Sequence, residues 1–110
     1  DVEWVIKAYD SKETLYYIDP PYDTATRNSV TYMKEFSFQQ MESLGELLQH
    51  VKGFVVVSGY FSEAWDRIFN NFKRTEKVTI DFNNNHRTES LWLSPRTASA
   101  LGLHPRIRLR

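Results

Sequence analysis

The amino-acid sequence predicts an α/β domain in which a crossover helix joins two parallel strands and a C-terminal β-hairpin follows. Three observations support this fold class. A short apolar run ends at a carboxylate and two prolines, a helix with clear end signals follows further along, and two later strand-like segments flank a turn-rich loop. Strands that alternate with helical segments are typical of βαβ units with parallel strands.

The first part of the chain predicts a helix and a strand. Four apolar residues within residues 2–9 have a spacing close to helical, and the turn Asp10-Ser11-Lys12 follows them. Leu15–Ile18 is a short apolar run. It predicts a strand that is buried on both faces, as parallel strands usually are.

The middle of the chain predicts a long loop and then a helix. Asp23–Phe36 is polar and lacks strong periodicity, so it predicts a loop. Ser37 and Gln40 form a capping-box pattern, and Gly53 follows the last apolar position of the expected helix. The apolar face of this helix comprises Phe38, Met41, Leu44, Leu47, Leu48 and Val51.

The remaining segments predict a second buried strand, a helix and a hairpin. Phe54–Val57 is the strand, and Ser62 is suited to cap a helix after it. Lys77–Phe82 and Thr88–Leu93 are expected to pair across the polar loop between them. The large side chains expected in the core are Trp65, Phe69, Phe72 and Trp92.

Size and composition restrict the class of protein. A chain of 110 residues with 41% hydrophobic residues fits one small domain with a core of its own. The absence of cysteine argues against a disulfide-stapled secreted module and fits a reducing cytoplasm. The longest apolar run is too short to span a membrane, and we expect no signal peptide and no membrane partner.

The charge of the chain is unevenly distributed although its net value is zero. Residues 1–95 contain ten Lys and Arg against fourteen Asp and Glu, whereas residues 96–110 contain four Arg and no acidic residue. We therefore expect one folded unit over 1–95 and a basic tail over 96–110. The tail is interpreted as a solvated terminus or, alternatively, as a segment that contacts phosphates.

The most informative segment is the one where the first strand meets Asp19-Pro20-Pro21-Tyr22. Two prolines end the strand, and the first of them holds Asp19 in an extended conformation. Ligands of open α/β sheets bind at the carboxyl ends of the strands. A carboxylate, a proline carbonyl and an aromatic ring at this position predict a pocket for a nucleobase with an exocyclic amine.

The same four residues resemble the catalytic motif of the amino-directed DNA methyltransferases, and their surroundings narrow the resemblance to the Dam-like adenine-N6 enzymes. Residues 1–11, 55–60 and 87–95 resemble the segments on either side of the motif in that family, in the same order. The resemblance implies the second half of a methyltransferase-type Rossmann-like sheet. It also implies S-adenosylmethionine as co-substrate, DNA as partner, and a cytoplasmic protein encoded by a bacterium, archaeon or phage.

The motif residues have distinct expected roles. Asp19 would accept a hydrogen bond from one N–H of the amine and the Pro20 carbonyl from the other, which makes the nitrogen more nucleophilic. Tyr22 would stack on the extruded base, and Pro21 would line its pocket. The chemistry alone does not separate adenine N6 from cytosine N4, and the resemblance favours adenine.

Other residues are weaker candidates, each with a purely structural alternative. Asp1 and Asp19 are expected to bind the cofactor, although Asp1 is also interpreted as a surface residue. Tyr60 would wall the base pocket or belong to a glycine-containing turn. Tyr32 would contact the substrate from the long loop, and Arg87 from the hairpin, unless these are plain connections. The scattered histidines predict no metal site.

One family feature is absent from the sequence. The resemblance implies a glycine-rich loop for the cofactor, yet no two of the four glycines are close enough to form one. We therefore expect the C-terminal portion of an enzyme that is inactive alone, with a missing N-terminal half or self-association through an exposed sheet edge. The alternative is a non-catalytic remnant that binds nucleic acid or a protein partner.

Overall fold

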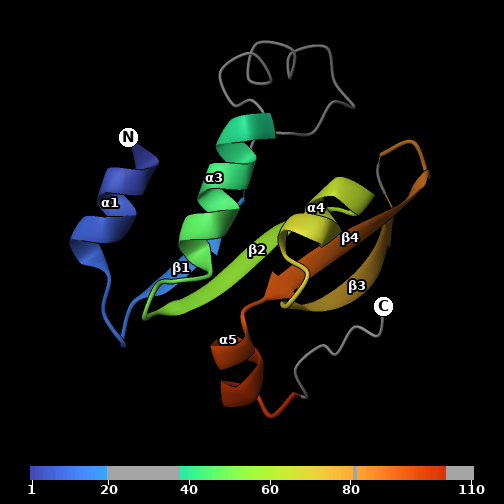
Figure 1. Cartoon of the computed structure of the whole chain (residues 1–110). Helices are drawn as coiled ribbons and strands as arrows, with labels where there is room; N and C mark the ends of the chain where they lie inside the picture. The colour runs from blue at the N-terminus through green and yellow to red at the C-terminus, as the bar shows by residue number, and fades with distance from the viewer. Residues whose placement is uncertain (20–37, 81, 104–110) are drawn as a thin grey trace.

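The computed structural model describes residues 1–19, 38–80 and 82–103. Helices and strands alternate along these residues except at the hairpin, where β3 leads directly into β4 (Figure 1). In chain order they are α1 (Val2–Tyr9), β1 (Leu15–Ile18), α3 (Phe38–Leu48), β2 (Phe54–Tyr60), α4 (Glu63–Ile68), β3 (Lys73–Ile80), β4 (His86–Leu93) and α5 (Pro95–Ala100).

The strands form a mixed four-stranded open sheet in the order β1-β2-β4-β3. β1 and β2 are parallel, and Ile18 pairs with Val57. β4 runs antiparallel to both of its neighbours, β2 and β3. The predicted α/β class, the parallel pair and the antiparallel hairpin are therefore confirmed.

Helices α1, α3 and α4 lie on one face of the sheet, and the core lies between them and the strands (Figure 1). Alternate residues of the strands point into this layer, as the two-residue period of a strand requires. The predicted core aromatics are buried, at 5% exposure or less. The cluster comprises Ile6, Tyr16, Met41, Leu44, Leu48, Val55, Val57, Trp65, Phe69, Phe72 and Trp92.

The opposite face of the sheet corrects the prediction that the first two strands are buried on both sides. In β1, Leu15 is 60% exposed and Tyr17 is 62% exposed, and only Tyr16 is buried. In β2, Phe54 and Val56 are half-buried. On β2, the guanidinium carbon of Arg96 from α5 lies 4.4 Å from the centre of the Phe54 ring. Among the described residues, no helix covers this face near β1, so the apolar side chains of β1 pack against helices on one face only.

Several element boundaries differ from the prediction. β2 continues to Tyr60 and β3 begins at Lys73, because the register of the hairpin pairs Lys73 with Leu93. α4 ends at Ile68, so Phe69 and Phe72 reach the core from the connection after the helix. The expected cap of α4 is confirmed, since the Ser62 side chain accepts a hydrogen bond from the Trp65 backbone N–H.

Helix α5 was not predicted, and it occupies the start of the segment expected to be a basic tail. Ser94 caps it and Pro95 stands in its first turn. The Thr97 hydroxyl accepts a hydrogen bond from the Val55 N–H at 2.9 Å, which docks the helix on β2. Arg96 donates to the Lys12 carbonyl at 2.9 Å. This arginine therefore stabilises the fold, and residues 104–110 lie outside the described residues.

The turn after α1 is joined to the turn before β2 by the carboxylate of Asp10. It accepts hydrogen bonds from the backbone N–H groups of Lys52 at 2.8 Å and Gly53 at 3.1 Å. The Tyr16 hydroxyl lies 3.1 Å from the same carboxylate and 2.9 Å from the Ile6 carbonyl. Burial and the contact with Asp10 raise the pKa of Tyr16 to about 12. The stabilisation by the protonated Tyr16 hydroxyl is therefore present below pH 10 and is lost as the pH rises from 10 toward 12.

We expect the Asp10 contacts to make stability depend on pH in the acid range. Burial raises the pKa of Asp10, but hydrogen bonds from Lys52, Tyr16 and Gly53 outweigh it, so the pKa lies below 3.8. The stabilisation is present above pH 3.8 and is lost as the pH falls through the lower, folded-state pKa. At pH 7, Asp10→Asn should lower the free energy of unfolding by about 1–3 kcal/mol. Urea unfolding should show this difference shrinking below pH 3.8, and a constant difference would contradict the assignment.

Gly53 is required where the chain enters β2, because no space exists for a side chain. A Cβ atom at this position would lie 2.4 Å from the Thr14 carbonyl oxygen. We expect Gly53→Ala to reduce stability by about 1–3 kcal/mol, since the backbone of Thr14 has to move. Thermal unfolding is the measurement, with Lys52→Ala as the neighbouring control. Equal melting temperatures for the two variants would contradict this prediction.

None of the helices within the described residues is long and apolar enough to span a membrane.

Candidate functional site

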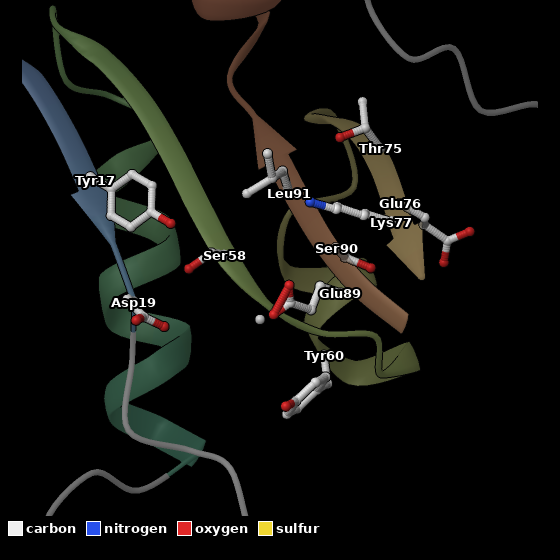
Figure 2. A pocket seen from close by; sticks show the side chains of 11 residues that line it. Tyr17, Asp19, Ser58, Tyr60, Thr75, Glu76, Lys77, Glu89, Ser90 and Leu91 are labelled. Carbon is white, nitrogen blue, oxygen red and sulfur yellow. The ribbon is translucent and has the colours of Figure 1, made fainter. Parts of the chain in front are cut away.

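A cavity of about 440 Å³ opens on the less covered face of the sheet (Figure 2). It extends from the carboxyl ends of the parallel strands β1 and β2 across β4 to β3. Its lining comprises Tyr17, Asp19, Ser58, Gly59, Tyr60, Thr75, Glu76, Lys77, Glu89, Ser90 and Leu91. The cavity therefore lies where ligands of open α/β sheets bind.

The parallel register brings two predicted site residues into this cavity. Because Ile18 pairs with Val57, the next residues along the two strands are Asp19 and Ser58. Tyr60 follows two positions later on β2 and also lines the cavity. Tyr60 therefore belongs to strand β2, beside the carboxyl end of β1, and not to a glycine-containing turn.

Arg87 reaches the site indirectly. It belongs to β4, and its guanidinium carbon lies 5.5 Å from the centre of the Tyr60 ring. A guanidinium against an aromatic face is attractive and restricts the orientation of the ring. Arg87 does not line the cavity itself. It therefore packs against the Tyr60 wall, and its predicted contact with DNA remains a prediction.

Charged side chains from the hairpin complete the cavity. In the strand register, Glu89 on β4 lies opposite Tyr60 on β2, and Lys77 on β3 lies opposite Glu89. Figure 2 shows Asp19 and Glu89 on opposite sides of the opening, with Ser58 between them. The cavity thus offers carboxylate acceptors on two sides, beside a tyrosine and a serine.

A partly buried ion pair holds β3, one of the strands that line the cavity, against α4. The Arg74 Nε lies 3.3 Å from the Asp66 carboxylate, and Arg74 also pairs with Glu76. The indole N–H of Trp92 donates to Asp66 at 3.0 Å. The Arg74 guanidinium lies 4.6 Å from the centre of the Phe61 ring, directly after Tyr60. The connection between β2 and α4 is therefore held against β3.

The other predicted site residues either lie away from this cavity or fall outside the described residues. Asp1 caps α1 by accepting a hydrogen bond from the Glu3 N–H at 3.1 Å and does not line the cavity. The roles predicted for Pro20, Pro21, Tyr22 and Tyr32 lie outside the described residues.

Sequence reasoning missed Tyr17, Lys77 and Glu89 as cavity residues. Alternation along β1 places Tyr17 on the same face as Asp19, and this was the available signal. It was overlooked because the strand was interpreted as buried on both sides. Glu89 and Lys77 depend on the register of the hairpin, which no local pattern in the sequence specifies.

The described residues do not form a cofactor loop. Gly45 packs against Ile68 and Gly53 against Thr14, so both glycines have structural roles. Gly59 lines the cavity as part of strand β2. Within the described ranges, no cluster of three or more His, Asp or Glu side chains is suited to hold a metal ion.

No protein-family model matches the chain, and the search of curated proteins finds no significant match. The function therefore has to be argued from the residues and the geometry of the cavity.

We expect loss of the Asp66 carboxylate to destabilise the wall of the cavity. Asp66→Ala leaves the guanidinium of Arg74 and the indole N–H of Trp92 without a buried acceptor, which should cost about 2–4 kcal/mol. Urea denaturation followed by tryptophan fluorescence measures this loss. Arg67→Ala, an exposed change in the same helix, should cost less than about 1 kcal/mol. Similar losses for the two variants would contradict the assignment.

Proposed function

We propose that the chain is part of a DNA methyltransferase that transfers a methyl group to adenine N6, with S-adenosylmethionine as co-substrate. The observation that carries the proposal is the presence of Asp19 and Tyr60 in one cavity at the carboxyl ends of two parallel strands. An extruded base needs a carboxylate for its amine and an aromatic ring for its face, and these two side chains provide both.

The chain's own residues would bind and orient the base. Asp19 is exposed at the end of β1, so its oxygens are accessible to an exocyclic N–H group. Tyr60 would form one wall, held in place by the guanidinium of Arg87. Ser58 lies beside Asp19 and is suited to hydrogen-bond a ring nitrogen. The roles of Pro20 and Tyr22 follow from the resemblance.

The exposed apolar surface near β1 supports the proposal that this chain is one portion of a larger catalytic unit. Among the described residues β1 pairs only with β2, so its other edge has no strand beside it. Leu15 and Tyr17 are exposed on this strand, and Trp4 and Tyr9 are 66% and 68% exposed on α1. Exposed large apolar side chains around an open strand edge are typical of a protein interface.

This surface also distinguishes the proposal from its alternative. A non-catalytic remnant that folds alone would gain from a polar edge, since an open apolar strand edge promotes aggregation. The observed edge is apolar on one face. It favours completion by further strands and helices, which would also supply the cofactor loop that the described residues lack.

The methyl group would come from the sulfonium of S-adenosylmethionine. Because the described residues do not form that cofactor's loop, we assign it no contacts in this chain. The contribution of the chain is restricted to the base, which Asp19 and Tyr60 would hold for attack.

We expect methyl transfer to depend on Asp19. The assay measures labelled methyl transfer from S-adenosylmethionine to duplex DNA, with the chain alone and with a methyltransferase N-terminal half that supplies the cofactor loop. The chain alone should show no transfer. In the complemented assay, Asp19→Ala should lower the rate at least about 100-fold, which corresponds to loss of a buried charge-assisted hydrogen bond to the reacting amine.

Glu13→Gln, an exposed change in the turn before β1, is the matched control and should keep the full rate. Circular dichroism should show the same helix content for both variants. Undiminished transfer by Asp19→Ala would remove this residue from the mechanism, and robust transfer by the chain alone would contradict the proposed division of the enzyme.

A further inference from the structure

The outer end of the β3–β4 hairpin exposes apolar side chains that the fold does not use. Val78 and Ile80 of β3 are 62% and 61% exposed, and Phe82 in the turn is fully exposed at 106%. Figure 1 shows that the hairpin extends past α4, so no helix of the described residues covers its end. We call Val78, Ile80 and Phe82 the apolar tip.

The same hairpin has a second, charged side. Because side chains alternate along a strand, Lys77 points to the face opposite Val78. Arg87 shares the face of Glu89, two positions along β4, which lines the cavity. The hairpin therefore presents Lys77, Arg87 and the carboxylate of Glu89 on the cavity side, and apolar groups on the other side and at its end.

The tip is continuous with the candidate site. Lys77 lines the cavity, and Phe82 follows five residues later. At about 3.3 Å per residue, β3 extends roughly 10 Å from Lys77 to its end at Ile80, and Phe82 follows in the turn. The major groove of DNA is about 12 Å wide and admits a two-stranded ribbon. A duplex with one base in the cavity would therefore lie within reach of Phe82.

We propose that Phe82 is an apolar wedge that enters the base stack next to the nucleotide extruded into the cavity. The proposal rests on the proposed function, because only a DNA substrate with an extruded base leaves a gap in the stack. Phenylalanine and other apolar side chains of DNA-binding proteins insert between base steps and unstack them. Lys77 and Arg87 would pair with the adjacent phosphates.

The geometry of the turn supports a narrow tip. Asn84 has a left-handed backbone with φ of 62°, which reverses the chain within a few residues. Phe82 thus stands at the end of a thin ribbon and not on a broad face. A second copy of the chain is the other partner suited to this apolar tip. In that case the oligomeric state would depend on Phe82.

The test measures binding of the 110-residue chain to two labelled duplexes of the same sequence by fluorescence anisotropy. One duplex is intact and the other contains an abasic site, where the gap already exists. The wild-type chain should bind the abasic duplex more tightly. Phe82→Ala should weaken that binding roughly tenfold and remove the preference, as expected for loss of one ring stacked on a base. Phe82→Trp should restore it.

Phe38→Ala is the matched control, since Phe38 is 53% exposed on α3 and should not affect binding. A preference that survives in Phe82→Ala, or that is absent from the wild-type chain, would overturn the wedge. If Arg87→Ala weakens binding to both duplexes while Phe82→Ala weakens neither, the wedge fails and the DNA partner of the proposed function stands. If the chain binds neither duplex, the wedge fails, and the complemented methyl-transfer assay decides the proposed function separately. A dimer in gel filtration that Phe82→Ala dissolves would assign the tip to a second copy and overturn the proposal.

Discussion

The parallel pairing of β1 with β2 is the constraint on which the site depends. The register pairs Ile18 with Val57, so Asp19 lies next to Ser58. Tyr60 lies two residues further along β2. A shift of one residue would move Tyr17 and Asp19 to the face covered by α1 and α3. The cavity would then lose its carboxylate, and a charge would enter the apolar core.

Contacts at the other end of the sheet keep this register. The Asp10 carboxylate binds the backbone N–H groups that precede β2, and Ser94 and Thr97 hold the Val55 N–H from α5. Parallel strands have no tight turn to align them, so such contacts between distant segments have to do so. The contacts that keep the register thus lie at one end of the parallel strands, and the cavity lies at the other.

The sequence allowed much of the fold to be predicted, because the apolar runs and helix caps are local signals. Ser62 marked the start of α4, and the aromatic side chains Trp65 and Trp92 were correctly placed in the core. The cavity was predictable only at Asp19 and Tyr60, whose positions follow from strand ends. Glu89 joins them through pairing between strands far apart in the sequence, which depends on tertiary structure.

The proposed function requires that this cavity recognise a base through its exocyclic amine. Amide chemical shifts of the isotope-labelled chain, titrated with adenosine and with inosine, test it most directly, because inosine lacks the amine. Adenosine should shift the amides of Asp19, Gly59 and Tyr60, and inosine should bind much more weakly. Equal responses to the two nucleosides, or shifts confined to residues away from the cavity, would contradict it.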